Sequence, residues 1–192
     1  MNTSAYETPR TMILTLATLE RADTLILPAS AAQLNRAQKV LEIDDFSEAV
    51  IAGIEYASPS LSRLIPAGTA TVEDLNELAH CLQQIDAEGE TAKYCTALEV
   101  ERPSTFSEAL DMAVNVDDYE LVHEDGWEYG REALRRIGAD DELLETIDGY
   151  TDFEQLGRAM MEEDGVRRTE FGLVRRLSSP FEEQLEMGQQ MQ

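Results

Sequence analysis

A local sequence pattern occurs twice between residues 115 and 172. Val116-Asp117-Asp118-Tyr119 is echoed by Ile147-Asp148-Gly149-Tyr150. Each copy is followed by an aspartate, four residues, a Gly-Arg pair and a further glycine. The repetition indicates that this half of the chain is built from two similar packing modules.

The two Gly-Arg pairs are Gly130-Arg131 and Gly157-Arg158. Both glycines fall inside predicted helices, where glycine costs up to about 1 kcal/mol relative to alanine. That cost indicates close packing at Gly130 and Gly157. We expect Arg131 and Arg158 to bridge neighbouring acids, so these four residues are interpreted as structural.

The balance of charge is strongly acidic. The chain has 39 Asp and Glu against 15 Lys and Arg, which gives a formal net charge of −24. Its 43% hydrophobic content argues against a disordered acidic tail. Self-repulsion at this charge favours an elongated shape. We expect no direct nucleic-acid ligand, because phosphates are bound by clustered Lys and Arg. The expected partner is a basic surface or a multivalent cation.

Apolar periodicity and turn residues predict an α+β fold, arranged as an elongated chain of small subdomains. The N-terminal α+β subdomain, residues 1–70, should contain a helix capped by Ser30. Its predicted strands cover residues 11–19, 24–27 and 49–56. The central helical subdomain, residues 71–103, should contain a helix capped by Thr71 and a second helix over residues 91–100.

The C-terminal acidic α+β subdomain covers residues 104–178, and a tail follows over residues 179–192. A helix through Val114 should bury Phe106, Leu110, Ala113 and Val114. A second helix, opening at Gly126-Trp127, should bury Trp127, Leu134 and Ile137. The other predicted helices cover residues 140–145 and 151–163, and the predicted strands cover residues 119–123 and 169–175.

Acidity is concentrated in the C-terminal half. Residues 101–150 hold 15 acidic and 4 basic side chains, whereas residues 1–50 hold 7 and 4. Folding should hold these carboxylates on the polar faces of helices and in turns. The candidate partner-binding residues are Glu108, Asp111, Asp117, Asp118, Glu124, Asp125, Glu128, Glu132, Asp140, Asp141, Glu142, Glu145, Asp148, Asp152, Glu162, Glu163 and Asp164.

Two interpretations of this surface are open. It is either a solvated face kept acidic for solubility, or an imitation of a polyanion. The excess of acids, with only Lys39 and Lys93 as lysines, favours the second. B-DNA carries one charge per about 1.7 Å of axis, so 24 charges correspond to roughly 41 Å of duplex.

No motif indicates an enzyme, a cofactor or a metal site. The acidic runs do not match a calcium-binding EF-hand loop. His80 and Cys81 are adjacent on a predicted helix and point about 100° apart, which disfavours a zinc site with Cys95 and His123. No nucleophile elbow, Cys/His dyad or phosphate loop is present. We therefore expect no catalytic residue.

The cysteine usage and hydropathy indicate an intracellular protein. Cys81 and Cys95 form no metal spacing and no disulfide framework, so we expect reduced thiols. The apolar run over residues 12–19 is too short to cross a bilayer and lacks a basic flank. The expected localisation is cytoplasmic.

The chain resembles the ArdA antirestriction proteins of conjugative elements, plasmids and phages. The resemblance is clearest over residues 106–174. It rests on the segments Asn115-Val116-Asp117-Asp118-Tyr119, Tyr129-Gly130-Arg131, Ile147-Asp148-Gly149-Tyr150, Phe153-Glu154-Gln155-Leu156-Gly157-Arg158 and Thr169-Glu170-Phe171-Gly172-Leu173-Val174. Looser matches lie at Leu27-Pro28-Ala29 and at Asp74-Leu75-Asn76-Glu77-Leu78-Ala79.

This resemblance implies an acidic, elongated homodimer in the cytoplasm of a bacterial host. Such a protein imitates bent B-form DNA, occupies the DNA-binding cleft of type I restriction-modification enzymes and inhibits them. Two alternatives stay open. The mimicry could address another DNA-binding target, such as a CRISPR effector or a nucleoid protein. The chain could also be an acidic adaptor for a basic partner without imitating DNA.

Overall fold

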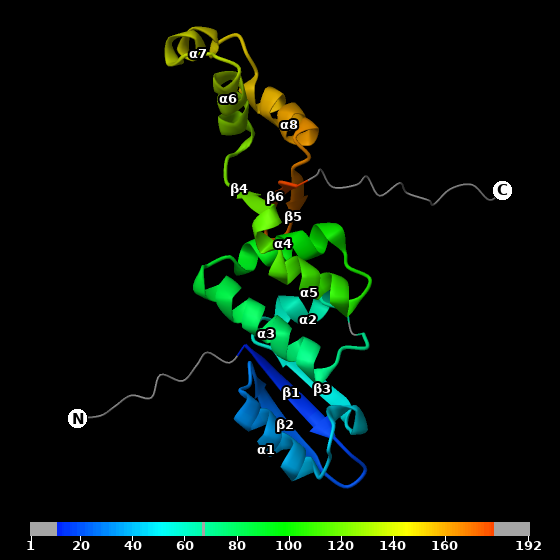
Figure 1. The fold of residues 1–192 in the computed structure, drawn as a ribbon. Coiled ribbons are helices and arrows are strands. Elements are labelled where there is room, and N and C mark those ends of the chain that lie inside the picture. The colour runs from blue at the N-terminus through cyan, green and yellow to red at the C-terminus, as the bar shows by residue number, and fades with distance from the viewer. Residues whose placement is uncertain (1–10, 67, 179–192) are drawn as a thin grey trace, which may run out of the picture. The chain divides into compact units, whose positions relative to one another are not determined.

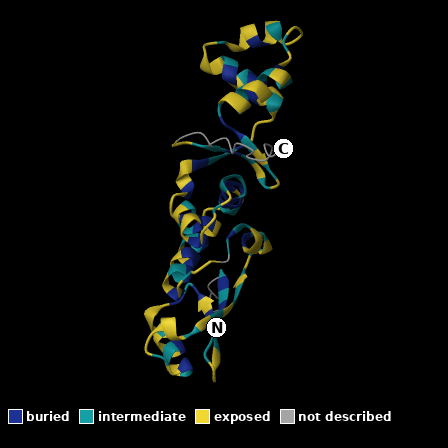
Figure 2. Ribbon diagram, turned by 90° about the vertical axis from the view of Figure 1, so that its right-hand side faces the viewer, coloured by how far each residue is buried: buried dark blue, intermediate teal, exposed yellow. Residues whose placement is uncertain are grey.

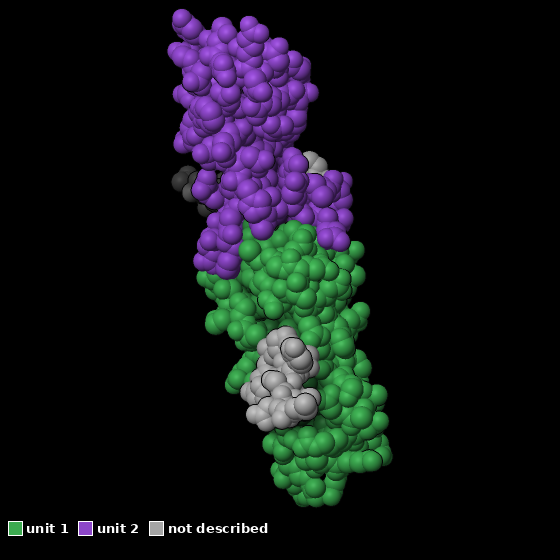
Figure 3. Space-filling model, turned by 90° about the vertical axis from the view of Figure 1, so that its left-hand side faces the viewer, with its two compact units in different colours: residues 1–116 green, residues 117–192 purple. Residues whose placement is uncertain are grey.

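The computed structural model describes residues 11–66 and 68–178. The chain divides into two compact units, residues 1–116 and 117–192, which are coloured separately in Figure 3. The described residues form α-helices and two antiparallel three-stranded sheets, which confirms the predicted α+β class. The predicted tail over residues 179–192 lies outside the described residues, and the elongated shape stays a prediction.

The first unit begins with a sheet in the order β2-β1-β3. Its strands are β1 (Met12–Ala17), β2 (Ala22–Leu27) and β3 (Val50–Tyr56), which confirms the three strands predicted there. Alternate residues of β1 are buried, as expected of a strand with one face on a core. Helix α1 (Ala31–Leu41) packs on β2, and its capping box joins Ser30 and Gln33 as predicted.

The remaining helices of the first unit form its second part (Figure 1). They are α2 (Pro59–Leu64), α3 (Val72–Ala87), α4 (Thr91–Glu101) and α5 (Phe106–Val114), and a 3-10 turn, η1 (Phe46–Glu48), precedes β3. Thr71 and Asp74 form the capping box of α3. The Asn76 side chain exchanges hydrogen bonds with the backbone of Ala29, at 2.6 and 3.2 Å, and so links α3 to the start of α1.

Helix α5 belongs to the first unit. It packs against α3 and α4, and the buried Tyr94 hydroxyl donates a 2.8 Å hydrogen bond to the Ala109 carbonyl. The boundary predicted at residue 104 therefore does not coincide with the boundary between the two units. Phe106 and Ala113 are buried as expected, but Val114 is 56% exposed, so its predicted burial is wrong. The division at residue 70 stays a prediction.

The two cysteines, both unpaired, should differ in reactivity. Cys95 is buried in α4, and burial raises the pKa of its thiol to about 11. Burial also raises the pKa of Cys81, which is only partly covered. Because the thiolate is the reactive form, a neutral thiol reagent at about pH 8 should modify Cys81 first, with Cys95 at least ~10-fold slower. Time-resolved mass spectrometry of Cys81→Ser and Cys95→Ser checks this; equal rates would contradict the burial of Cys95.

The second unit is a small sheet joined to three helices. Its sheet has the order β4-β6-β5, and its helices lie on the connection between β4 and β5 (Figure 1). A 3-10 turn, η2 (Val116–Asp118), crosses the boundary between the units. The elements after it are β4 (Tyr119–Val122), α6 (Gly126–Arg136), α7 (Asp141–Ile147), α8 (Phe153–Glu163), β5 (Arg167–Thr169) and β6 (Gly172–Arg176). The strand predicted over residues 169–175 is confirmed only in part: Thr169 ends β5, residues 170–171 form a turn, and β6 begins at Gly172.

Helices α6 and α8 approach each other through the repeated glycines. A Cβ atom on Gly130 would overlap the Phe153 carbonyl oxygen and lie 3.0 Å from the Gly157 nitrogen. A Cβ atom on Gly157 would overlap the Gly126 carbonyl oxygen. The two copies of the sequence pattern thus pack directly against each other, backbone to backbone.

The arginines of the two pairs have different surroundings. The Arg131 guanidinium lies 4.7 Å from the centroid of the Trp127 ring and 5.5 Å from that of Phe153, and an Arg131 nitrogen is 3.6 Å from Asp148. Arg158 forms a 2.7 Å ion pair with Glu154 one turn earlier on α8. Both arginines contact a nearby carboxylate.

Burial along α6 differs from the expectation. Trp127 is 43% exposed and Ile137 is 80% exposed, so the predicted burial of both is wrong. Tyr129, Gly130 and Ala133 form the buried side instead. The packed face is displaced toward the glycine because the close contact with α8 forms there. No helix among residues 11–66 and 68–178 is long and apolar enough to cross a membrane.

Candidate acidic partner-binding surface

Almost all of the predicted partner-binding carboxylates are on the surface. Of the 17, only Asp164 is half-buried, and the other sixteen are exposed. Figure 2 colours exposed residues yellow and shows many of them on the helices of the second unit. Glu108 and Asp111 belong to α5 in the first unit, and the others belong to the second unit. The candidate set is therefore divided between two units.

Three of these acids begin helices. The Asp125 carboxylate accepts a 2.8 Å hydrogen bond from the Glu128 backbone at the start of α6. Asp140 and Asp152 do the same for α7 and α8, accepting from Leu143 and Gln155. An acid at a helix N-terminus accepts a hydrogen bond from a backbone N–H that has no partner within the helix. Its negative charge also interacts favourably with the positive end of the helix dipole. Asp125, Asp140 and Asp152 thus stabilise the scaffold as well as adding charge.

Another group of the acids is engaged by arginine. Asp141 and Glu132 both pair with Arg135, at 2.8 and 3.3 Å, and the hydrogen bond from Arg135 lowers the pKa of Asp141. Asp164 pairs with Arg136 at 3.3 Å and accepts a hydrogen bond from the Tyr129 hydroxyl. Their charge is partly neutralised within the protein.

Hydrogen bonding holds one acid of α5 ionised. The Glu108 carboxylate accepts a 2.7 Å hydrogen bond from the backbone N–H of Ser104. This bond, with a second one from the Ser104 hydroxyl, lowers the pKa of Glu108. Glu108 lies in the first turn of α5 and bonds back to Ser104, just before the helix, so its first role is structural.

Eight of the predicted acids form neither an ion pair nor a hydrogen bond through their carboxylates with any described residue. We call them the unpaired carboxylates: Asp111, Asp118, Glu124, Glu128, Glu142, Glu145, Glu162 and Glu163. All are exposed. Their full charge faces solvent, where a basic partner can reach it without first breaking an internal contact.

Sequence reasoning left out a second set of exposed acids in the first unit. Their distribution is less dense, but they are as exposed as the predicted set. They include Glu20, Asp44, Glu55, Glu73 and Glu77. Their exposure could have been predicted from residue type alone, because carboxylates are almost never buried without a partner.

The helix-capping acids should contribute stability that the unpaired carboxylates do not. Asp152→Ala removes the cap of α8 and should lower the free energy of unfolding by about 1 kcal/mol. Glu163→Ala is the matched control, because it is an exposed acid at the opposite end of α8, where negative charge is unfavourable. Urea unfolding followed by circular dichroism measures both; a loss in Glu163→Ala equal to that in Asp152→Ala would contradict the assignment.

The described residues also show what chemistry the surface could perform. No group of three or more His, Cys, Asp and Glu side chains among residues 11–66 and 68–178 could hold a metal ion. The expectation of no metal, no cofactor and no catalytic residue stays a prediction. What each unit offers is exposed negative charge on a folded scaffold.

The comparisons with known proteins give no family. No protein-family model matches the sequence, and a search of curated proteins finds no match.

Proposed function

We propose that this chain is a DNA-mimic antirestriction protein. It occupies the DNA-binding cleft of type I restriction-modification enzymes in the bacterial cytoplasm and inhibits them, acting as a homodimer. The observation that carries the proposal is the set of exposed, unpaired carboxylates fixed on a folded scaffold. The resemblance of residues 106–174 to the ArdA family supplies the identity of the target.

The physical mechanism is substitution of carboxylates for phosphates. Lys and Arg side chains that grip the DNA backbone would meet carboxylates instead, and complementary charge speeds association. Because Asp125, Asp140 and Asp152 cap the helices, the surrounding charges are held in place before binding. A preorganised surface loses little conformational entropy on binding.

Inhibition of a purified type I enzyme tests the proposal. The protein should block DNA cleavage and should itself be displaced from the enzyme by excess duplex DNA. Affinity should fall about tenfold or more between about 50 mM and about 200 mM salt, because the contacts are ionic. Binding that duplex DNA does not reverse would exclude mimicry and favour an acidic adaptor. A pull-down from host lysate that recovers another DNA-binding protein, released by DNA, would redirect the proposal to that target.

A further inference from the structure

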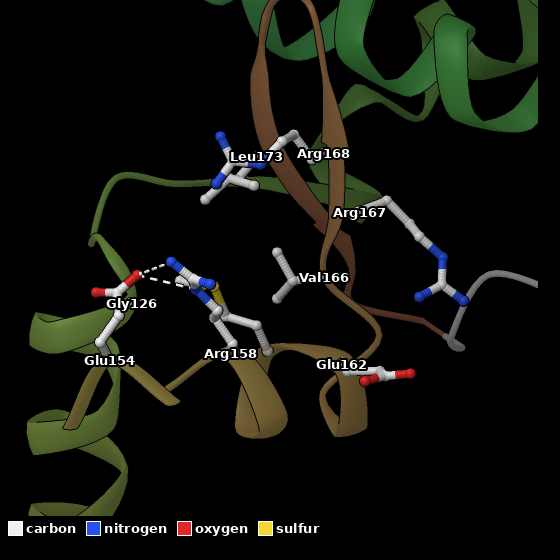
Figure 4. Close-up of a pocket in the computed structure, with 9 residues that line it drawn as sticks. Gly126, Glu154, Arg158, Glu162, Val166, Arg167, Arg168 and Leu173 are labelled. Atoms are coloured by element: carbon white, nitrogen blue, oxygen red, sulfur yellow. Dashed lines mark hydrogen bonds and ion pairs between the residues drawn. The ribbon is translucent and has the colours of Figure 1, made fainter. Parts of the chain in front are cut away.

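The second unit contains a basic pocket of about 630 Å³. Arg158 of α8 and Arg167 and Arg168 of β5 line it, together with Met161, Val166 and Leu173 (Figure 4). Glu154, Glu162 and Gly126 complete the lining. Three arginines around one concavity are unexpected in a chain whose formal charge is −24.

Two of these arginines have no ion-pair partner among the described residues. Arg158 pairs with Glu154, but the guanidinium groups of Arg167 and Arg168 form no ion pair, hydrogen bond or ring contact there. Elsewhere in the second unit, arginines such as Arg131 and Arg175 each lie against a carboxylate. Unsatisfied guanidinium groups beside an open pocket favour an anionic occupant, which they can bind with forked hydrogen bonds.

The base of the pocket is apolar. Met161 and Val166 are buried and belong to the hydrophobic core of the unit, and Leu173 packs against the same core. In the view of Figure 4 the Val166 side chain projects between those of Arg158 and Arg167. Strand β5 is also the edge of its sheet, without a strand partner on its outer side among the described residues. The pocket therefore suits a segment that combines acids with apolar side chains.

The chain itself carries such a segment just beyond the described residues. Residues 181–187 read Phe-Glu-Glu-Gln-Leu-Glu-Met. In an extended conformation Phe181, Leu185 and Met187 share one face with Glu183, whereas Glu182 and Glu186 share the other with Gln184. That alternation places three apolar side chains toward the apolar base and two carboxylates, Glu182 and Glu186, toward the charged rim.

The segment is also within reach. Strand β6 pairs antiparallel with β5, with Val174 opposite Arg167, so β6 ends at Arg176 beside the start of β5. Val166, which immediately precedes β5, lines the pocket. The link from Arg176 to Phe181 can extend at most about 17 Å. A short connection can thus bring the acidic segment to the arginines.

We propose that residues 181–187 bind in the basic pocket of their own chain. Their carboxylates pair with Arg167 and Arg168, and their apolar side chains cover Met161, Val166 and Leu173. The bound segment neutralises the only arginines of the second unit without a partner among the described residues. This inference does not depend on the proposed function.

Hydrogen exchange of the full-length protein tests the proposal. At dilute concentration, backbone amides in residues 181–187 should exchange about tenfold more slowly than unstructured peptide, the scale of several exposed charge pairs acting together. Arg167→Glu with Arg168→Glu should abolish this protection. Adding Glu182→Arg and Glu186→Arg should restore it, because the charges are then exchanged across the contact.

Two further variants keep the result interpretable. Arg36→Glu with Lys39→Glu makes the same charge change on exposed residues of α1 and should leave the protection intact. Glu182→Gln, Glu183→Gln and Glu186→Gln should remove it without touching a described residue. Exchange at the unstructured rate in the unaltered protein would overturn the proposal. Protection that increases with protein concentration would assign the pocket to a second copy and would also overturn it.

Discussion

Neutralising five unpaired carboxylates of the second unit together should weaken inhibition of a type I enzyme by about 100-fold. The variant combines Asp118→Asn, Glu124→Gln, Glu128→Gln, Glu142→Gln and Glu145→Gln. Each single change should cost less than about fivefold, because an exposed charge pair contributes at most about 1 kcal/mol. The combined loss of affinity is the sum of several small contributions from individual charge pairs. Titration of cleavage activity against inhibitor concentration measures it, in parallel with circular dichroism to verify folding.

The control is an equal charge change elsewhere. Glu20, Asp44, Glu55, Glu73 and Glu77 are exposed acids of the first unit, and their carboxylates bond to no described residue. Neutralising these five should weaken inhibition less than neutralising the five of the second unit. Equal losses would mean that net charge, rather than this surface, determines binding. A single substitution that abolished inhibition of a folded protein would contradict the distributed-charge model.

Helix starts could be predicted from the sequence because their signals are local. Ser30 and Gln33, and Thr71 and Asp74, form the capping boxes that their spacing indicates. The strands of the first sheet followed from short β-prone runs between turn residues. These features depend on neighbouring residues alone, so no knowledge of tertiary contacts was needed.

Burial could not be predicted equally well, because it depends on partners distant in sequence. Helical spacing indicated that Trp127 and Ile137 lie on the packed side of α6, yet both are exposed. The close approach of Gly157 to Gly126 and Gly130 instead turns the side formed by Tyr129, Gly130 and Ala133 inward. The turn at residues 170–171 was missed because it interrupts an otherwise strand-like run, next to a φ of +141° at Gly172, the first residue of β6.

For the candidate surface, too, one property could be predicted from the sequence and another could not. Exposure of the acids was predictable, because a carboxylate is rarely buried. Their separate roles were not. Asp125 and Asp152 cap helices, Asp141 forms an ion pair with Arg135, and the Glu128 carboxylate contacts no described residue. From the sequence, all four were predicted to have the same role, which is binding a partner. Only the contacts distinguish charge that stabilises the fold from charge that is available to a partner.

Gly157→Ala should destabilise the second unit by about 2 kcal/mol or more. The added Cβ atom would overlap the Gly126 carbonyl oxygen and approach the Gly130 nitrogen to 2.7 Å. Both are backbone atoms, so α6 and α8 must separate, and overpacking of this kind costs more than the helix propensity that alanine gains. Thermal unfolding should shift downward by roughly 10 °C. Hydrogen exchange should locate the change in α6 and α8, with the sheet of the first unit unaffected.

Gly149→Ala is the matched control, because no atom lies within 4 Å of the Cβ position at Gly149. It should change stability by less than about 0.5 kcal/mol. A Gly157→Ala protein as stable as the Gly149→Ala control would mean that the two helices do not approach through their glycines.

The same variant separates geometry from charge. Gly157→Ala leaves the formal net charge at −24, yet it moves α6 and α8, which carry Glu128, Glu162 and Glu163. A DNA mimic depends on the spacing of its carboxylates, so inhibition by the still-folded fraction at low temperature should weaken severalfold. An acidic adaptor that needs only net charge would bind its partner as before. Full inhibition by a protein with demonstrably displaced helices would therefore contradict mimicry while leaving the acidic surface as the binding site.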